Sequence, residues 1–202
     1  MELTKDDTWE ILSPTRTGSK TLVYCVEQSY SVSNIRLNLY FPDDKPTDKL
    51  PYKSIWHSHT HEILNHLNDK TKVVLSVRDP REIALSVCIV EHFKHWHIPR
   101  SDPKLVSQTR KSVPKYKIDP DKFVFQFSEI RMWYNVPINR NYIKIDYKDF
   151  KDNVPAIYNM LDIPAPLYTF LPIVQNPAPL KDWVENWDEI LEVYNDLPDF
   201  PY

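Results

Sequence analysis

The sequence predicts an α/β protein built on a mostly parallel central sheet flanked by helices, and three observations support this fold class. Strand-like and helix-like patterns alternate along the 202 residues, the order expected of βαβ units. The run KVVLSV, residues 72–77, is apolar almost throughout, as in a strand buried on both faces. It leads into DPREIALSVCIVEHF, residues 79–93, where Asp79 is a candidate N-cap and Pro80 suits the first helical position.

The first part of the chain adds three strands and two helices. Residues 8–14, TWEILSP, form an apolar run that predicts a buried strand entering a loop, and residues 19–30, SKTLVYCVEQSY, have helical spacing. Residues 34–41, NIRLNLYF, alternate as a strand does, and residues 52–59, YKSIWHSH, predict another. Residues 61–69, HEILNHLND, predict a short helix.

The remaining part continues the alternation. Residues 119–136, DPDKFVFQFSEIRMWYNV, open with a second Asp-Pro and predict a helix with an aromatic face. Residues 141–147, NYIKIDY, alternate as a strand, and residues 148–164 predict one further helix. The tail after residue 175 carries an amphipathic helix between Pro-rich ends, and the basic, Pro-punctuated segment 94–120 has no clear period.

Length and composition limit the function classes. A chain of this length suits one domain over residues 1–202, and a formal charge of −3 argues against nucleic-acid binding. No segment has the ~20 apolar residues needed to span a bilayer. Cys25 and Cys88 lie in apolar runs, and the N-terminal residues lack the apolar stretch of a signal peptide, so we expect a cytoplasmic protein with buried thiols.

The loop at residues 13–18 contains Gly18, the only glycine of the chain. A loop between a strand and a helix N-terminus is where backbone N–H groups and the helix dipole favour an anion. Glycine allows positive φ and lets a phosphate approach without a Cβ in the way. The neighbouring side chains supply positive charge or hydroxyl donors: Arg16, Thr17, Ser19, Lys20 and Thr21. These residues fit an anion site and an ordinary turn with solvated cations equally well.

The ending GSKT is similar to a Walker A loop, but the spacing does not fit. That loop needs a glycine five positions before its Gly-Lys-Thr and a lysine directly after the second glycine. Here Ser13 holds the first of these positions, and Ser19 separates Gly18 from Lys20. A P-loop kinase that uses ATP and Mg²⁺ is therefore kept only as an alternative function.

A second candidate motif follows the buried strand 72–77. Arg78 stands at its C-terminal end, where open α/β sheets bind ligands, and Ser86 lies two turns into the next helix. A guanidinium can fork onto a phosphate, with a serine hydroxyl as a further donor. The alternative is an Arg78–Asp79 ion pair and a serine on the helix surface.

Together the two motifs resemble the PAPS-dependent sulfotransferase family. Its first motif has the form Pro-(Lys/Arg)-Ser-Gly-Thr-Thr, on which residues 16–20 fall, with Thr15 where the proline usually stands. Its second motif is usually RDPRDVAVS, which RDPREIALS at 78–86 follows almost residue for residue. Residues 142–164 are similar to the family's RYEDL strand and the helix after it. The resemblance covers most of residues 9–165. The chain is short for the family and in this resembles its bacterial and viral branches, which include the nodulation-type enzymes.

This resemblance implies a P-loop-like sulfotransferase fold, with 3′-phosphoadenosine 5′-phosphosulfate (PAPS) as co-substrate, adenosine 3′,5′-bisphosphate (PAP) as product, and no metal. The implied 5′-phosphosulfate contacts come from the residues Arg16, Thr17, Gly18, Ser19, Lys20 and Thr21. Arg78 and Ser86 would hold the 3′-phosphate. Lys20 stands where the family has a hydroxyl residue, and could make the same contact as an ammonium.

All seven histidines lie between His57 and His97. His57, His59 and His61 alternate in WHSHTHE and would share one face if the strand continued. The residues alone permit a metal site, a general base, or strand-end histidines without a role. The family's Lys-Thr-His at a strand end favours a general base. His59 is the candidate, with His57 in the lysine position, and His57, His61 or Glu62 are the alternative bases.

The acceptor is less well defined. A small molecule, a glycan or a peptide would fit the family, and the oligomeric state is open. The segment 94–120, the aromatic helix 119–136 and the histidines His92, His95 and His97 are candidates to line the acceptor pocket. Several basic residues suggest an anionic or glycan acceptor, although a solvated basic loop explains them equally simply: Lys104, Arg110, Lys111, Lys115 and Lys117. A non-catalytic, metal-binding protein is the other alternative.

Overall fold

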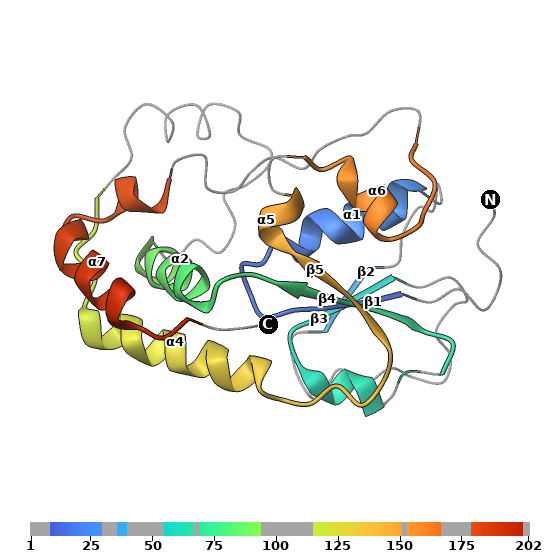
Figure 1. Ribbon diagram of the computed structural model, residues 1–202, viewed down its shortest axis with the longest axis horizontal. Coiled ribbons are helices and arrows are strands. Elements are labelled where there is room, and N and C mark those ends of the chain that lie inside the picture. Colours follow the sequence, from blue (N-terminus) through green and yellow to red (C-terminus); the bar gives the residue numbers. More distant parts are fainter. Residues whose placement is uncertain are drawn as a thin grey trace. The chain divides into compact units, whose positions relative to one another are not determined.

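The computed structural model describes residues 9–29, 36–39, 55–65, 67, 69–93, 115–150, 153–166 and 179–199 (Figure 1). The chain divides into two compact units, each made of two stretches of sequence. The first unit comprises Met1–Arg78 and Val136–Pro172, and the second comprises Asp79–Asn135 and Ile173–Tyr202. The expectation of one domain over the whole chain stays a prediction.

The first unit contains a five-stranded sheet in the order β2-β3-β1-β4-β5, and every strand pair in it is parallel. The strands are β1 (Trp9–Leu12), β2 (Arg36–Leu39), β3 (Ile55–Ser58), β4 (Lys72–Val77) and β5 (Tyr142–Asp146). Each lies within or overlaps a stretch that the sequence assigns to a strand. The predicted α/β class with a parallel central sheet is therefore confirmed, and β1 is its central strand.

The helices of the first unit pack on this sheet. Helix α1 (Ser19–Ser29) and the short helix α6 (Ala156–Met160) share one hydrophobic core with Trp9, Ile11 and Val74. Figure 1 shows α1 and α6 side by side. Because Trp9 and Ile11 point into this core and neighbouring strand residues alternate, Glu10 points to the opposite face of the sheet.

Two predicted helices of this unit take a different form. Residues 148–164 do not form one helix: α5 (Tyr147–Phe150) and α6 are separate, since Pro155 has no N–H to continue a helical ladder and Asn153 N instead closes a turn on Phe150 O. The short helix expected at 61–69 is the 3₁₀ helix η1 (His61–Asn65).

The second unit is helical in its described part. Its long helices α2 (Pro80–Phe93) and α4 (Pro120–Tyr134) begin as predicted: Asp79 Oδ1 accepts from Arg81 N at 2.8 Å, and Asp119 Oδ1 accepts from Asp121 N at 3.0 Å. The 3₁₀ helix η2 (Leu180–Trp183) and helix α7 (Trp187–Asp196) complete a core with α2 and α4. No helix among the described residues is long and apolar enough to cross a bilayer.

Candidate functional site

The loop between β1 and α1 adopts the backbone conformation that its glycine suggested. Gly18 has φ +76°, and Arg16, two residues earlier, has φ +64°. A positive φ is uncommon outside glycine and is often found at ligand sites, where surrounding structure holds it. Thr21 N donates to Gly18 O at 2.8 Å, so the first turn of α1 starts directly from the glycine.

Gly18 has a second reason to be glycine, which the sequence did not reveal. A Cβ added there would lie 2.7 Å and 2.9 Å from two ring carbons of Tyr147 and 3.2 Å from Phe150 Cζ. Both aromatic residues belong to α5, which follows β5. The sequence suggested that the missing Cβ makes room for a phosphate, whereas in this structure the Cβ direction is filled by aromatic side chains.

Side chains from β4 and from its C-terminal end hold the loop backbone in place. Ser76 Oγ donates to Thr17 O at 3.0 Å, and Arg78 Nη1 donates to Arg16 O at 2.9 Å. The fully buried Thr17 hydroxyl donates to Pro14 O at 3.3 Å. The predicted phosphate-contacting hydroxyl of Thr17 thus closes the loop on itself, and the loop is fixed before any ligand arrives.

Arg16 and Arg78 form a pair of neighbouring cations. Burial, and after it the positive charge of Arg78, lower the pKa of Arg16 to about 10. The Arg78 guanidinium lies 4.6 Å from the centre of the Tyr147 ring, so an aromatic face supports one side of it. Asp79, which the sequence offered as an alternative partner for Arg78, is bound by Arg81 at 2.7 Å. Two cations held together at a helix N-terminus favour an anion.

The other predicted loop residues lie at the start of α1. Ser19 is buried, whereas Lys20 and Thr21 are partly exposed. The charge of Lys20 acts on His59 and contributes to lowering its pKa. The loop, Lys20 and His59 are therefore brought together in the first unit.

His59 is held in one orientation just after β3. Its Nδ1 lies 2.7 Å from Ser13 O, and because a carbonyl oxygen only accepts, Nδ1 carries the proton. Burial is the main cause that lowers the pKa of His59 below 6.5, so the ring is neutral at pH 7. In that form Nε2 is the acceptor nitrogen, as a general base requires.

The other two histidines take different positions. His57, on β3, is buried; its Nε2 lies 3.5 Å from Ser13 Oγ, and its ring meets that of His59 edge-on at 4.6 Å. The strand ends at Ser58, so the three histidines do not continue along one strand face. His61 instead opens η1, and burial lowers its pKa as well. Among the described residues, no group of three His, Cys, Asp or Glu could hold a metal ion.

Sequence reasoning missed Glu10, a fully buried carboxylic acid on the central strand. Ser58 Oγ donates to Glu10 Oε1 at 2.5 Å, whereas Oε2 has no hydrogen-bond partner among the described residues. Burial raises the pKa of Glu10 to about 7. The one sequence signal was a single glutamate inside the apolar run WEIL, and the strand beside it, which carries His57, is known only from the structure.

The remaining predicted residues lie on other elements or outside the described residues. Ser86 lies on α2 in the second unit and is 1 % exposed, so its predicted pairing with Arg78 stays a prediction. Glu62 is exposed on η1, and His92 is exposed on α2. The acceptor candidates His95, His97, Lys104, Arg110 and Lys111 lie outside the described residues.

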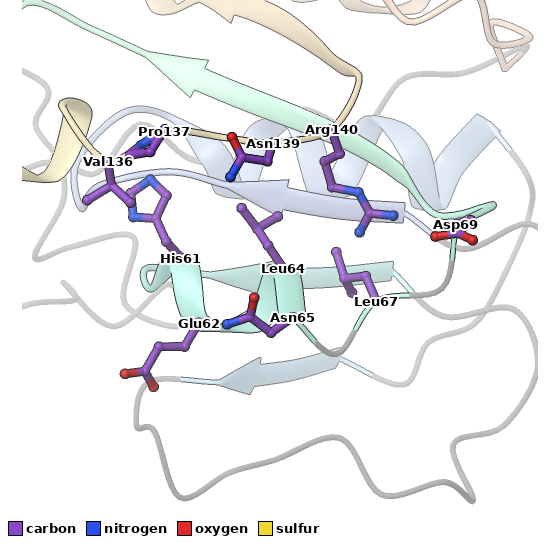
Figure 2. Close-up of a pocket in the computed structure, with 10 residues that line it drawn as sticks. All are labelled: His61, Glu62, Leu64, Asn65, Leu67, Asp69, Val136, Pro137, Asn139 and Arg140. Carbon is purple, nitrogen blue, oxygen red and sulfur yellow. The ribbon is translucent and has the colours of Figure 1, made fainter.

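A pocket of about 460 Å³ opens between η1 and the segment 136–140 that precedes β5 (Figure 2). His61 forms part of its wall, and Figure 2 shows the imidazole beside Val136. The site region of the first unit thus combines a cation-rich loop, a neutral histidine and a pocket that starts two residues beyond that histidine.

Comparisons with known proteins give structural matches only. No protein-family model matches the chain, and no curated protein matches its sequence. Mouse sulfotransferase SULT7A1 complexed with PAP aligns with 81 % of this chain at 16 % identity and a TM-score of 0.41. Retinol dehydratase with retinol and PAP aligns with 80 % at 18 % identity and 0.37, and its complex with androsterone and inactive PAP with 96 % at 15 % and 0.36.

The alignments cover 61 %, 60 % and 65 % of those three longer chains. This chain therefore spans about three fifths of the length of the structures that it matches. At these identities and TM-scores, the activity of this chain has to be argued from its own residues.

Proposed function

We propose that the protein is a sulfotransferase that moves the sulfuryl group of PAPS to a hydroxyl acceptor. The observation that carries this proposal is the pair Arg16 and Arg78, two neighbouring cations at the N-terminus of α1, one within the loop and one bonded to its backbone. A multiply charged anion such as a phosphosulfate relieves their mutual repulsion. A neutral ligand would not.

In the proposed reaction, the acceptor oxygen attacks sulfur while the bond from sulfur to the 5′-phosphate oxygen breaks. The new bond is acceptor O–S, the leaving group is PAP, and the acceptor proton passes to His59 Nε2. As in phosphoryl transfer, the protein mainly positions the groups and neutralises spreading charge. Arg16, Lys20 and the N-terminal amides of α1 would stabilise the charge that builds on the departing phosphate.

The hydrogen bond from His59 Nδ1 to Ser13 O supports the role of His59 as the base. This hydrogen bond fixes the tautomer in which Nε2 accepts. After proton transfer, the same bond to Ser13 O stabilises the imidazolium. His57, which touches the same serine and the His59 ring, supports this geometry from β3.

The second motif would select the nucleotide. Arg78 would bind the 3′-phosphate together with Ser86, distinguishing PAPS from nucleotides without that group. The proposal admits a small molecule, a glycan or a peptide as acceptor and requires no metal. We also propose that the reaction takes place in the cytoplasm.

Incubation with sulfur-labelled PAPS and a panel of saccharides, phenols, lipids and tyrosyl peptides tests the proposal. We expect label to move from PAPS to one acceptor class, with PAP formed in equal amount. The His59→Ala variant should fold and bind PAP but transfer at least ~10²-fold more slowly, because the acceptor loses its base. Label transfer at the wild-type rate in this variant would remove His59 from the mechanism, and the absence of PAP binding in the wild type would refute the function.

A further inference from the structure

The pocket beside η1 has a lining that indicates what it holds. It is bounded on one side by η1 and the residues after it, and on the other by residues 136–140. Figure 2 shows Leu64 and the amide of Asn139 pointing into the gap, and the Arg140 side chain extending across it toward Leu67. Its volume of about 460 Å³ is within the ordinary range for small-ligand sites.

This pocket begins next to the proposed base. Only Thr60 separates His59 from His61, so their Cα atoms are at most ~7 Å apart. Thr60 Oγ1 accepts from Glu62 N at 3.3 Å, which helps to set the turn from the strand end into η1. A ligand seated against His61 can therefore present one of its groups to His59.

The polar side chains of the lining suit vicinal hydroxyl groups. Asn65 and Asn139 each offer a donor and an acceptor, Arg140 offers donors only, and Asp69 offers acceptors. A hydroxyl group both donates and accepts, so a ligand with several of them can use every one of these groups. Leu64 and Leu67 add apolar surface against which C–H groups can pack.

The charge and the ring content of the described lining disfavour two other acceptor classes. The lining residues that the structure describes include two carboxylates, Glu62 and Asp69, and one guanidinium, that of Arg140, and the lowered pKa of His61 keeps that ring neutral near pH 7. An anionic ligand would therefore be repelled. No Phe, Tyr or Trp is among the described residues that line the pocket, so they offer a phenol or another aromatic ligand no ring to stack on.

We propose that this pocket holds the acceptor and that the acceptor is an uncharged, hydroxyl-rich molecule of the saccharide type. The inference rests on the proposed sulfuryl transfer for its catalytic meaning, although binding to the pocket can be measured without it. Of the anionic or glycan acceptor that the basic residues of segment 94–120 suggested, it favours the glycan.

Saturation-transfer NMR with maltose as the probe tests binding, and glucuronate and phenol serve as comparison ligands. We expect signal transfer to maltose but not to glucuronate or phenol. Asn139→Ala should weaken maltose binding at least ~10-fold, since the amide's donor and acceptor are lost together. Asn159→Ala, the matched control on the exposed surface of α6, should leave it within about twofold.

PAP binding, measured separately by calorimetry, keeps the two proposals apart. Unchanged PAP affinity in Asn139→Ala, with KM for maltose raised and kcat nearly kept, would support the acceptor pocket. Wild-type protein that binds PAP but no saccharide, or maltose binding that Asn139→Ala leaves intact, would overturn the inference while the sulfotransferase proposal stands. If PAP does not bind but maltose does and Asn139→Ala weakens it, the pocket survives as a saccharide site and its catalytic role falls with the proposed function.

Discussion

Arg16 and Arg81 occupy opposite electrostatic surroundings, each within its own unit. Arg16, in the loop before α1, is partly buried beside a second guanidinium, and its pKa falls to about 10. Arg81, in the first turn of α2, binds Asp79 at 2.7 Å and Asp199 at 3.0 Å and lies 4.8 Å from the centre of the Tyr194 ring. Its hydrogen bond to Asp79 is the main cause that raises its pKa.

The difference distinguishes an arginine that stabilises the fold, Arg81, from one that is placed to bind a ligand, Arg16. The charge of Arg81 is balanced within the second unit, so its removal should affect stability. The charge of Arg16 is opposed by its surroundings, which is common where a site is arranged to stabilise an anion and rare where a charge only supports the fold. The predictions below test that distinction.

The largest effect is expected for Arg16→Ala. Loss of one preorganised electrostatic donor typically lowers turnover by ~10²–10³-fold, and removing a cation from beside Arg78 should leave the melting temperature unchanged or raised. Steady-state assays with PAPS and thermal unfolding measure the two quantities. Arg81→Ala is the matched control, and equal loss of turnover in both variants would erase the distinction.

Gly18→Val should be the next largest. The added side chain meets the Tyr147 ring at 2.7 Å and forces a β-branched residue to φ +76°. Overpacking and a left-handed backbone together cost ~2–5 kcal/mol, measurable by urea unfolding, and PAP binding should be lost. Gly18→Val/Tyr147→Ala relieves the contact but not the φ strain, so it should recover part of the stability. Full stability in Gly18→Val would mean that the loop is not packed as described.

Glu10 extends the comparison to a buried acidic group whose ionisation should destabilise the folded protein. Its folded pKa is about 7 against an ordinary value of 4.5, so the folded protein retains a proton that the unfolded chain releases. Stability should therefore fall as pH rises from 4.5 through 7, by ~3 kcal/mol in all. Glu10→Gln should remove this dependence and be the more stable protein at pH 8, with no gain at pH 4. Parallel pH–stability curves for the two proteins would contradict this.

Arg81→Ala should give the smallest effect, a loss of ~1 kcal/mol in the free energy of unfolding. The ion pair with Asp79 is only partly exposed, whereas the pair with Asp199 is on the surface and contributes little. Chemical denaturation at low and high salt measures the loss, which should shrink at high salt. A PAPS turnover within about threefold of the wild type would complete the contrast with Arg16→Ala, and a loss of ~10²-fold would break it.

The sequence predicted what is local and missed what depends on distant contacts. The Asp79 and Asp119 caps, the buried strand β4 and the glycine loop are each written within a few residues, so they were predicted correctly. The helix expected over 148–164 was wrong because the effect of Pro155 outweighed the apolar pattern.

Two features of the site could not be found in this way. Gly18 is close to α5 only because β5 aligns beside β4, and Glu10 meets Ser58 only because β1 pairs with β3. The sequence around Gly18 and Glu10 does not indicate that α5 and Ser58 are their neighbours. The opposite environments of Arg16 and Arg81 are likewise invisible in the motifs that contain them, since both read as a basic residue near a helix start.

The central claim is that the cation pair and loop of the first unit bind the phosphates of PAP. Isothermal titration calorimetry with PAP, and with ATP plus Mg²⁺, tests it most directly. We expect PAP to bind with or without Mg²⁺, and ATP–Mg²⁺ to bind at least ~10-fold more weakly. ATP lacks the 3′-phosphate that Arg78 would hold, and a phosphate held by a charged donor adds on the order of 1.5–3 kcal/mol. Tighter binding of ATP–Mg²⁺ than of PAP would contradict the account and favour a phosphotransferase.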